Sequence, residues 1–284
     1  MGLARRQREC TVALVTAVVA LVAGSSTAEP VEVPARERIA QHGVLRVCST
    51  GDYRPFTYHA PDGTWSGYDV DAAGDMAQAL GVRLELVPTT WKSLVADVGT
   101  SCDLAMGGIS VSPDRARQAR FTAPYLHDGK AAITRCAEAH RFHDLRDVDE
   151  PGVRVIVNPG GGNAAFDESH LHRASVVTWP DNNTIFDRLA AGAADVMVTD
   201  VSEIRWQTAM NRTLCGVAVD QPFTSEQKAY LLPAGSQDLL QWTDRWLDVA
   251  THDGTYGTLN QKYFGGKGGG QPPADVTSAH RGAG

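Results

Sequence analysis

The sequence lacks the common motifs for binding nucleotides, dinucleotides and metals. No Lys-Ser or Lys-Thr pair follows its central glycine-rich loop, which is therefore not a Walker loop, and the loop does not read GxGxxG. Cysteine is scarce, with five in 284 residues, and no CxxC or Cys/His metal spacing occurs. We therefore expect neither a metal site nor a cofactor.

Positive charge and long apolar runs are also scarce. Lys and Arg number 26 against 33 Asp and Glu, a net charge of −7. Such an acidic chain is a poor nucleic-acid binder, and an anionic ligand has to be held by a local cluster of cations. Beyond the N-terminus no segment is apolar enough to span a bilayer, so we expect no membrane span in the mature chain.

The N-terminus has the layout of a secretory signal peptide. A basic start, "MGLARRQRE", precedes the 14-residue apolar run "CTVALVTAVVALVA" and the small-residue end "GSSTA". Cleavage after Ala28 would remove residues 1–28 and leave 23 basic and 32 acidic residues, a net charge of −9. The sequence predicts a periplasmic or secreted protein.

Strand and helix patterns alternate along the rest of the chain. Apolar segments such as "VLRVCS", "RLELVP", "VRVIVN" and "DVMVTD" are separated by amphipathic runs, and the alternation restarts after residue 130. The pattern predicts an α/β protein of two lobes, each a mainly parallel sheet flanked by helices, with a ligand in the cleft between them. We expect lobe 1 over residues 43–131, lobe 2 over 132–224, a return to lobe 1 over 225–264, and a disordered tail over 265–284.

Four cysteines follow the signal peptide, and export makes disulfides possible. Cys136 follows the apolar segment "AAITR" and Cys215 lies within "TLCGV", which places both in the same predicted half, so we expect them to pair. Cys48 and Cys102 lie in or beside predicted strands, where a free, buried cysteine is the ordinary interpretation.

Two glycine-rich loops follow predicted strands. In "MGGISVSPDRAR", exposed backbone at Gly108, the hydroxyl of Ser110 and the guanidinium of Arg115 together suit a carboxylate, although a lone Arg here could simply be solvated. In "VIVNPGGGN", backbone donors at a helix N-terminus would face an anion, or form a plain tight turn. The candidates in this second loop are Asn158, Gly161, Gly162 and Asn163.

Three more candidates lie on other loops and strands. Tyr53 in "GDYRPFTY" and Trp91 in "TTWKS" could wall a ring-shaped ligand, or pack beneath their loops. Lys228 in "EQKAYLLP" could add a positive charge, or be solvated.

The segment "DVMVTDVSEIRWQ" carries two acids three residues apart. With Asp200 as N-cap, Glu203 falls at the third helical position, which resembles a capping box. From spacing alone this structural explanation needs no function, and a ligand clamp or an acid catalyst stays open.

The segments "GDYRPFTY", "WSGYDVD", "GGISVSPDRARQARFTAPY" and "KAYLLP" resemble the exported solute-binding proteins of type II topology, over residues 43–264. The resemblance implies that Ser110 and Arg115 hold a ligand carboxylate and that Asp200 meets an ammonium group. Under this interpretation the protein is a non-catalytic binder that delivers an amino acid or related carboxylate to an ABC permease.

A narrower resemblance is to the cyclohexadienyl dehydratases, exported enzymes with the same fold. It rests on "PTTWKSL", "DLAMGGISVSP", "APYLHDGK", "GVRVIVNPGGGN", "PDNNTIF", "MVTDVSE" and "QKAYLLP". The resemblance implies loss of water and carbon dioxide from prephenate or arogenate, with Glu203 as general acid and the same Cys136–Cys215 pair. The sequence departs from the family where Gly162 replaces a Thr and where Gln227 replaces a Glu.

This chemistry needs a protonated carboxyl group near neutral pH. Burial in a closed cleft, the nearby Asp200 and a dianionic ligand would raise the pKa of Glu203, whereas the helix N-terminus would lower it. We therefore expect an enzyme acting on a small-molecule carboxylate, with a solute-binding protein as the alternative.

Overall fold

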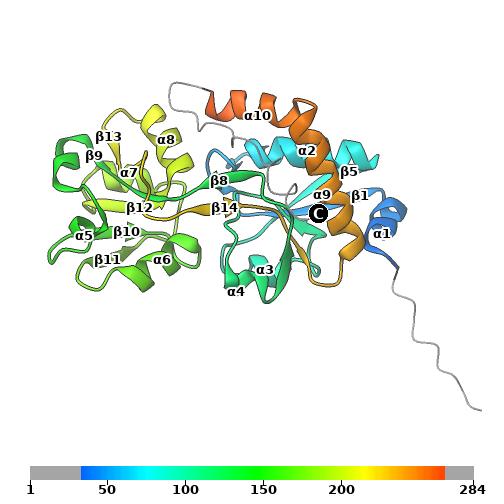
Figure 1. The fold of residues 1–284 in the computed structure, drawn as a ribbon, viewed down its shortest axis with the longest axis horizontal. Coiled ribbons are helices and arrows are strands. Elements are labelled where there is room, and N and C mark those ends of the chain that lie inside the picture. Colours follow the sequence, from blue (N-terminus) through cyan, green and yellow to red (C-terminus); the bar gives the residue numbers. More distant parts are fainter. Residues whose placement is uncertain (1–32, 266–284) are drawn as a thin grey trace, which may run out of the picture. The chain divides into compact units, whose positions relative to one another are not determined.

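The alternating apolar and polar segments fold into two five-stranded sheets with helices against them, as the computed structural model shows for residues 33–265 (Figure 1). The predicted signal peptide (residues 1–28) and residues 266–284 of the predicted tail lie outside the described residues. No helix between residues 33 and 265 combines the length and hydrophobicity that crossing a bilayer requires.

The first sheet has the strand order β5-β1-β6-β15-β7. Strands β5 and β6 run parallel to β1, whereas β15 runs antiparallel to both β6 and β7, so four of the five strands point the same way. This sheet is mainly parallel, as the sequence predicts. Its strands are β1 (Val44–Ser49), β5 (Arg83–Pro88), β6 (Leu104–Ala105), β7 (Ala119–Phe121) and β15 (Leu231–Pro233).

The second sheet has the order β11-β10-β12-β9-β13. Strands β10, β11 and β12 are mutually parallel, and β9 is antiparallel to β12 and β13. Apolar side chains cover both faces of the sheet in two separate clusters. Its strands are β9 (Lys130–Arg135), β10 (Arg154–Val157), β11 (Ser175–Thr178), β12 (Val196–Asp200) and β13 (Leu214–Val217).

Two short strands connect the sheets. Strand β8 (Leu126–Asp128) leads from β7 to β9, and β14 (Glu226–Lys228) leads from β13 back to β15. The two pair antiparallel and lie side by side between the lobes (Figure 1). The chain thus passes from the first sheet to the second through β8 and returns to the first sheet through β14. The lobe boundaries expected after residues 131 and 224 remain predictions.

Several helices match their sequence signals. Helix α2 (Tyr68–Leu80) ends at Gly81, which has a left-handed conformation with φ of 70°. The other helices are α1 (Ala35–His42), α3 (Leu94–Asp97), α4 (Pro113–Ala116), α5 (Leu145–Val148), α6 (Gly162–His170), α7 (Ile185–Ala190), α8 (Val201–Met210) and α9 (Gln237–His252). A short 3-10 helix, η1 (Cys136–Arg141), and a small sheet of β2 (Asp52–Tyr53), β3 (Thr57–His59) and β4 (Trp65–Ser66) complete this set.

A further packed helix follows α9. Gly254, with φ of 96°, reverses the chain, and α10 (Thr255–Phe264) then packs against α9 and α2. The sequence expectation missed this helix because only three of its ten residues, Tyr256, Leu259 and Phe264, are buried, which makes a weak apolar pattern.

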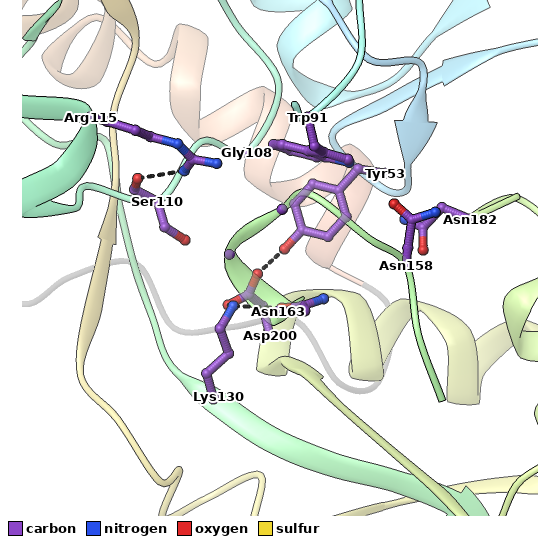
Figure 2. A pocket seen from close by; sticks show the side chains of 12 residues that line it. Tyr53, Trp91, Gly108, Ser110, Arg115, Lys130, Asn158, Asn163, Asn182 and Asp200 are labelled. Atoms are coloured by element: carbon purple, nitrogen blue, oxygen red, sulfur yellow. Dashed lines mark hydrogen bonds and ion pairs between the residues drawn. The ribbon is translucent and has the colours of Figure 1, made fainter. Parts of the chain in front are cut away.

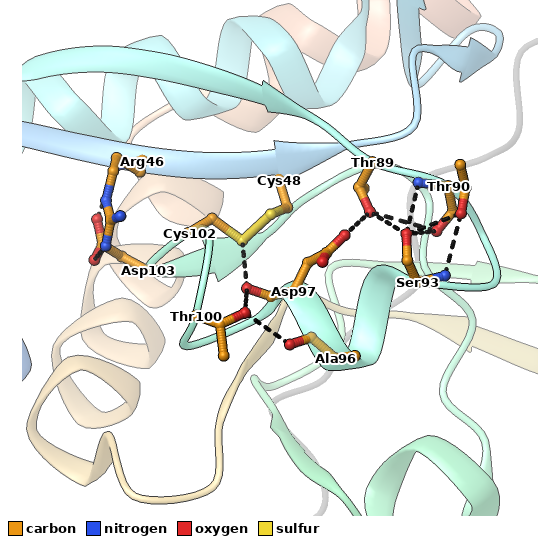
Figure 3. The surroundings of a disulfide bond; sticks show 10 residues. All are labelled: Arg46, Cys48, Thr89, Thr90, Ser93, Ala96, Asp97, Thr100, Cys102 and Asp103. Atoms are coloured by element: carbon orange, nitrogen blue, oxygen red, sulfur yellow. Dashed lines mark hydrogen bonds and ion pairs between the residues drawn. A yellow bond between two sulfur atoms is a disulfide. The ribbon is translucent and has the colours of Figure 1, made fainter.

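Both pairs of cysteines form disulfides. Cys136 and Cys215 are joined, as predicted. The expectation that Cys48 and Cys102 are free is wrong, because they too are bonded (Figure 3). Strand order explains the pairing: β6 lies next to β1, with Cys48 opposite Ala105, which brings Cys102 close despite a separation of 54 residues.

Candidate functional site

A pocket lies between the lobes, with a cavity of about 30 Å³ (Figure 2). Both parts of the chain line it, because loops at the strand ends of the two sheets face each other. The residues from the first lobe are Tyr53, Trp91, Gly108, Ser110 and Arg115, and those from the second are Lys130, Asn158, Gly161, Gly162, Asn163, Asn182 and Asp200.

Parallel strands of the second sheet position the polar side of the pocket. Asn158 follows β10 directly, Asp200 is the last residue of β12, and Gly162 and Asn163 begin α6. Their positions agree with the rule that ligands bind at the carboxyl ends of such strands. Lys130 joins them from β9, where it lies directly opposite Asp200.

Asp200 is almost fully buried and accepts three hydrogen bonds. Lys130 Nζ donates to Oδ1 at 2.8 Å, Lys228 Nζ donates to Oδ2 at 2.7 Å, and the Tyr53 hydroxyl also donates to Oδ2. Burial by itself would raise the pKa of this carboxyl, but the charges of the two lysines lower that pKa well below its usual range. Asp200 is therefore a carboxylate.

The capping-box interpretation is wrong in its side-chain contacts. Asp200 does occupy the N-cap position of α8, yet its side chain makes no capping hydrogen bond. The two lysines and Tyr53 take its oxygens instead, and Glu203 accepts from Thr199. Both acids thus serve interactions within the site, because charged donors outcompete a backbone N–H for a buried carboxylate.

Glu203 lies one turn into α8 and is 1% exposed. Thr199 Oγ1 donates to its Oε2 at 2.6 Å. Burial raises the pKa of Glu203 to about 8, with further contributions from the negative charges of Asp200 and Asp52, although the Thr199 hydrogen bond and Lys130 oppose the shift. At pH 7 Glu203 is therefore mainly a neutral carboxylic acid, just behind the pocket wall.

Arg115 and Ser110 lie on the opposite wall. Arg115 Nη1 donates to the Ser110 carbonyl oxygen at 2.9 Å, and its guanidinium carbon lies 5.9 Å from the centroid of the Trp91 ring. Ser110 Oγ donates to Glu226 Oε2 and accepts from Lys228 Nζ, both at 2.8 Å. Only part of the guanidinium is engaged, which leaves N–H donors directed into the cavity (Figure 2).

Aromatic rings and one amide close the pocket across the lobes. The rings of Tyr53 and Trp91 meet edge to face, with centroids 5.5 Å apart. Trp91 Nε1 donates to Asp52 Oδ1 at 3.1 Å, and Asn182 Nδ2 donates to the Asp52 carbonyl oxygen at 2.9 Å. The Asn182–Asp52 bond and the contact of Tyr53 with Asp200 hold the lobes together around a small cavity, while the Trp91–Asp52 bond orients the Trp91 ring within the first lobe.

Lys228 supports the pocket from behind. Its side chain is fully buried and does not line the cavity, and its Nζ contacts Asp200, Ser110 and, at 3.4 Å, the Tyr53 hydroxyl. The alternative of a solvated lysine is thus wrong, because the side chain reaches inward to a buried carboxylate.

Two glycines in the pocket wall differ in the space that a side chain would have. Gly108 has φ of 64°, and a Cβ there would lie 2.6 Å from the rings of Phe56 and Tyr53, so only glycine fits. Gly162 meets no such limit, since a Cβ there would lie 4.0 Å from its nearest neighbour, Lys130 Nζ. The absence of a side chain at residue 162 therefore leaves room beside Lys130.

Sequence reasoning missed three residues of the site. Lys130 and Asn182 belong to "APYLHDGK" and "PDNNTIF", which carry the family resemblance, but neither stands in a glycine loop or an obvious charge cluster. Thr199 precedes Asp200 and reads as an ordinary strand residue. Across residues 33–265 no group of His, Cys, Asp and Glu is placed to hold a metal ion.

The comparisons with known proteins point to one family. The family model described as bacterial extracellular solute-binding proteins, family 3, matches residues 45–266. A cyclohexadienyl dehydratase of Pseudomonas aeruginosa is 46% identical over 219 residues, which are 77% of this chain and 81% of that protein.

Two solved structures are similar as well. An ancestral amino acid-binding protein, described as a precursor of cyclohexadienyl dehydratase, superposes with a TM-score of 0.75 at 30% identity over 81% of this chain and 99% of its own. An ancestral cyclohexadienyl dehydratase is 42% identical over 81% of this chain and 96% of its own, with a TM-score of 0.51. The relatives thus include both an enzyme lineage and its binding-protein precursor.

Proposed function

We infer an enzymatic function for this chain, which belongs to the bacterial extracellular solute-binding proteins of family 3. It is a dehydratase that converts prephenate to phenylpyruvate, arogenate to phenylalanine, or both, with loss of water and carbon dioxide. The roles of individual residues that follow are proposals built on the geometry of the pocket.

The reaction needs one proton delivered to one oxygen. Protonation of the ring hydroxyl lets it leave as water, the bond between the ring and its carboxylate breaks to release carbon dioxide, and the electron pair of that bond completes the aromatic ring. Proton donation to the leaving oxygen is general-acid catalysis, which contributes about 10²- to 10⁴-fold in rate.

Glu203 is the acid in this proposal, and its burial is the observation that carries it. A carboxyl group whose pKa is raised to about 8 holds its proton at pH 7, and it lies behind Asn163, a residue of the pocket wall. Its neighbour Asp200 has the opposite shift and is ionised. Two carboxyls with pKa values pushed apart by their surroundings are typical of an acid and a fixed charge in one active site.

The cations of the pocket suit a substrate with two carboxylates. Arg115 reaches in from the first lobe with the Ser110 loop, and Lys130 and the N-terminus of α6 face it from the second. We propose that Arg115 and Ser110 hold one carboxylate, that the loop of Asn158, Gly161, Gly162 and Asn163 receives the other charged end, and that Tyr53 and Trp91 wall the ring.

Substrate entry requires the lobes to separate. A cavity of about 30 Å³ has room for about two water molecules and none for a substituted ring. The connecting strands β8 and β14 are the places where such a movement turns, because they alone link the two sheets among residues 33–265. Closure then expels water and orients the leaving groups.

The function is tested with the mature protein and prephenate. Formation of phenylpyruvate above the uncatalysed rate supports the proposal. No phenylpyruvate above that rate, with the protein folded, would contradict the proposal. Circular dichroism of the same sample reports whether the protein is folded. The cyclohexadienyl dehydratase of Pseudomonas aeruginosa serves as the positive control.

The alternative is a solute-binding protein for an amino acid or related carboxylate. Asp200, which the resemblance assigns to a ligand ammonium, already accepts hydrogen bonds from Lys130, Lys228 and Tyr53. An amino acid, arogenate included, would have to displace one of these donors, whereas prephenate brings no ammonium group. Tight binding of an amino acid in a thermal-shift screen, without turnover of prephenate, would favour the alternative and a permease partner.

We further propose that the protein works outside the cytoplasm. Its family is extracellular and it contains two disulfides. Residues 1–28 as a cleavable signal peptide would deliver it to the periplasm or the medium, and N-terminal sequencing of the exported protein, with a start at Glu29 expected, tests this.

A further inference from the structure

An unbroken chain of hydrogen bonds leads from the pocket to Glu203. Lys130 Nζ donates to Asn163 Oδ1 at 2.7 Å, Asn163 Nδ2 donates to Thr199 Oγ1 at 2.9 Å, and Thr199 Oγ1 donates to Glu203 Oε2 at 2.6 Å. Lys130, Thr199 and Glu203 are each at most 2% exposed, so water does not compete with these bonds. Lys130 is itself held by Asp200.

The direction of this chain is fixed by chemistry at its first member. A lysine ammonium can only donate, so Asn163 turns its carbonyl oxygen toward Lys130 and its amide nitrogen toward Thr199. The amide nitrogen can only donate as well, so the Thr199 oxygen accepts and its own hydrogen is left for Glu203. Reversing either of the first two steps would leave two donors facing each other, and if Thr199 accepted from Glu203 instead, its own hydrogen would have no other acceptor among residues 33–265.

The orientation of the Thr199 hydroxyl makes the two carboxyl oxygens of Glu203 inequivalent. Oε2 accepts the Thr199 hydroxyl, which disfavours a proton on that oxygen. Within residues 33–265 the one hydrogen bond to this carboxyl group is at Oε2, and none involves Oε1. In the protonated carboxyl group, Oε1 is thus the oxygen that carries the hydrogen.

We propose that Thr199 is a positioning residue of the dehydratase: its hydroxyl, oriented by Asn163 and Lys130, holds Oε2 so that Glu203 presents its proton on Oε1 to the leaving hydroxyl of the substrate. The proposal rests on the proposed function and adds to it. Thr199 itself does not line the cavity. It acts through Glu203, because a carboxyl group free to rotate would present the wrong oxygen for part of the time.

Removal of this one hydroxyl has two separable effects. Thr199→Val keeps the branched shape in a fully buried strand position but cannot donate. We expect kcat on prephenate to fall about 10-fold or more while KM changes by less than about twofold, since the acid is misplaced and the carboxylate contacts are kept. Because the Thr199 bond lowers the pKa of Glu203, its loss moves the alkaline limb of the kcat profile to higher pH.

Three further variants separate this role from a merely structural one. Thr199→Ser restores a hydroxyl and should recover both kcat and the pH profile. Thr134→Val removes another fully buried hydroxyl from the same sheet, where Thr134 donates to the Asp195 carbonyl oxygen, and should leave kcat and its pH profile unchanged. In a Glu203→Gln background, Thr199→Val should cause no additional loss of kcat.

The possible results distinguish a failure of the proposed function from a failure of the role of Thr199. Wild-type protein without turnover overturns the proposed function itself. Two outcomes with an active wild type overturn the role of Thr199 alone. In the first, Thr199→Val has the kcat and pH profile of wild type. In the second, Thr199→Val loses kcat without a shift of the pH profile, and Thr199→Ser does not recover it. If Thr199→Val does not fold, Thr199→Ala in the same comparison with Ser gives the same decision.

Discussion

Lys130 and Asp200 face each other across β9 and β12, with Lys130 Nζ 2.8 Å from Asp200 Oδ1 and both side chains at most 4% exposed. Lys228 reaches the other oxygen of the same carboxylate from β14. One buried acid thus joins the second sheet to a strand that connects the lobes, and it fixes two cations near the cavity.

Loss of this carboxylate should destabilise the fold. Asp200→Ala leaves two lysines buried without their partner, and breaking a buried ion pair from one side costs about 3–5 kcal/mol. Urea unfolding at pH 7 measures the change. Glu150→Ala, which removes an exposed pair with Arg173, is the control and should cost less than about 1 kcal/mol. Equal losses in the two variants would contradict the account.

The same prediction has a pH dependence. The pKa of Asp200 is lowered in the folded state, so its stabilisation is present above the unfolded pKa of about 3.9 and is lost as the pH falls through the lower folded pKa. The stability difference between wild type and Asp200→Ala should therefore shrink in strong acid.

Glu203 should affect stability with the opposite sign. Its folded pKa is raised to about 8, so its contribution is fully present below the unfolded pKa of about 4.3 and is lost as the pH rises toward 8. In this window wild type should lose stability relative to Glu203→Gln by about 1.4 kcal/mol per pH unit. Urea unfolding of both proteins at pH 5, 6 and 7 measures the difference, and a constant difference would show that Glu203 is ionised throughout.

Asp167 provides a matched control for that measurement. It is buried, neither of its carboxyl oxygens has a hydrogen-bond partner in the described part of the chain, and burial raises its pKa to about 7. Asp167→Asn should therefore also flatten the pH dependence of stability. Unlike Glu203, which is connected to the pocket through Thr199 and Asn163, the Asp167 carboxyl has no hydrogen bond to any pocket residue among residues 33–265, so the pH profile of turnover should stay that of wild type.

Gly162 should control access beside Lys130. A Cβ at this position points toward Lys130 Nζ with no closer neighbour, so Gly162→Phe adds a ring where the substrate is expected to bind. We expect KM for prephenate to rise about 10-fold with the melting temperature nearly unchanged. Gly108→Ala should instead lower the melting temperature, because the new Cβ meets two rings and the backbone has positive φ. An unchanged KM in Gly162→Phe would remove this position from the substrate site.

The two disulfides should differ in their resistance to reduction. Cys48 and Cys102 are fully buried, whereas Cys136 and Cys215 are partly exposed. Mild reductant followed by alkylation and mass spectrometry should label Cys136 and Cys215 first. Each bond closes a loop long enough to stabilise the fold by about 4 kcal/mol in the chain-entropy account. Labelling of Cys48 before Cys136 would contradict the burial of the first pair.

The sequence was most informative where function depends on strand ends. Ligand loops at the carboxyl ends of parallel strands follow from hydrophobic pattern and glycine position, and Asn158, Asn163 and Asp200 meet in the pocket for that reason. The resemblance led to Glu203 as the acid, and its burial could not be read from spacing, because it depends on how α8 packs.

The residues that were missed depend on contacts across the fold. Lys130 lies opposite Asp200 only because β9 turns back antiparallel to β12, and the Cys48–Cys102 bond depends on β6 lying beside β1. Neither neighbour relation is encoded locally. Thr199 has no distinguishing sequence signal, since its role arises from the orientation of Asn163.

The most direct test of the account compares wild type with Glu203→Gln in a single turnover of prephenate at pH 7. Gln keeps the shape and the hydrogen bond from Thr199 but has no acidic proton. The account predicts phenylpyruvate from wild type, and from Glu203→Gln prephenate binding of similar strength with product formation reduced at least about 100-fold. Full turnover by Glu203→Gln would contradict the assignment of Glu203 as the acid.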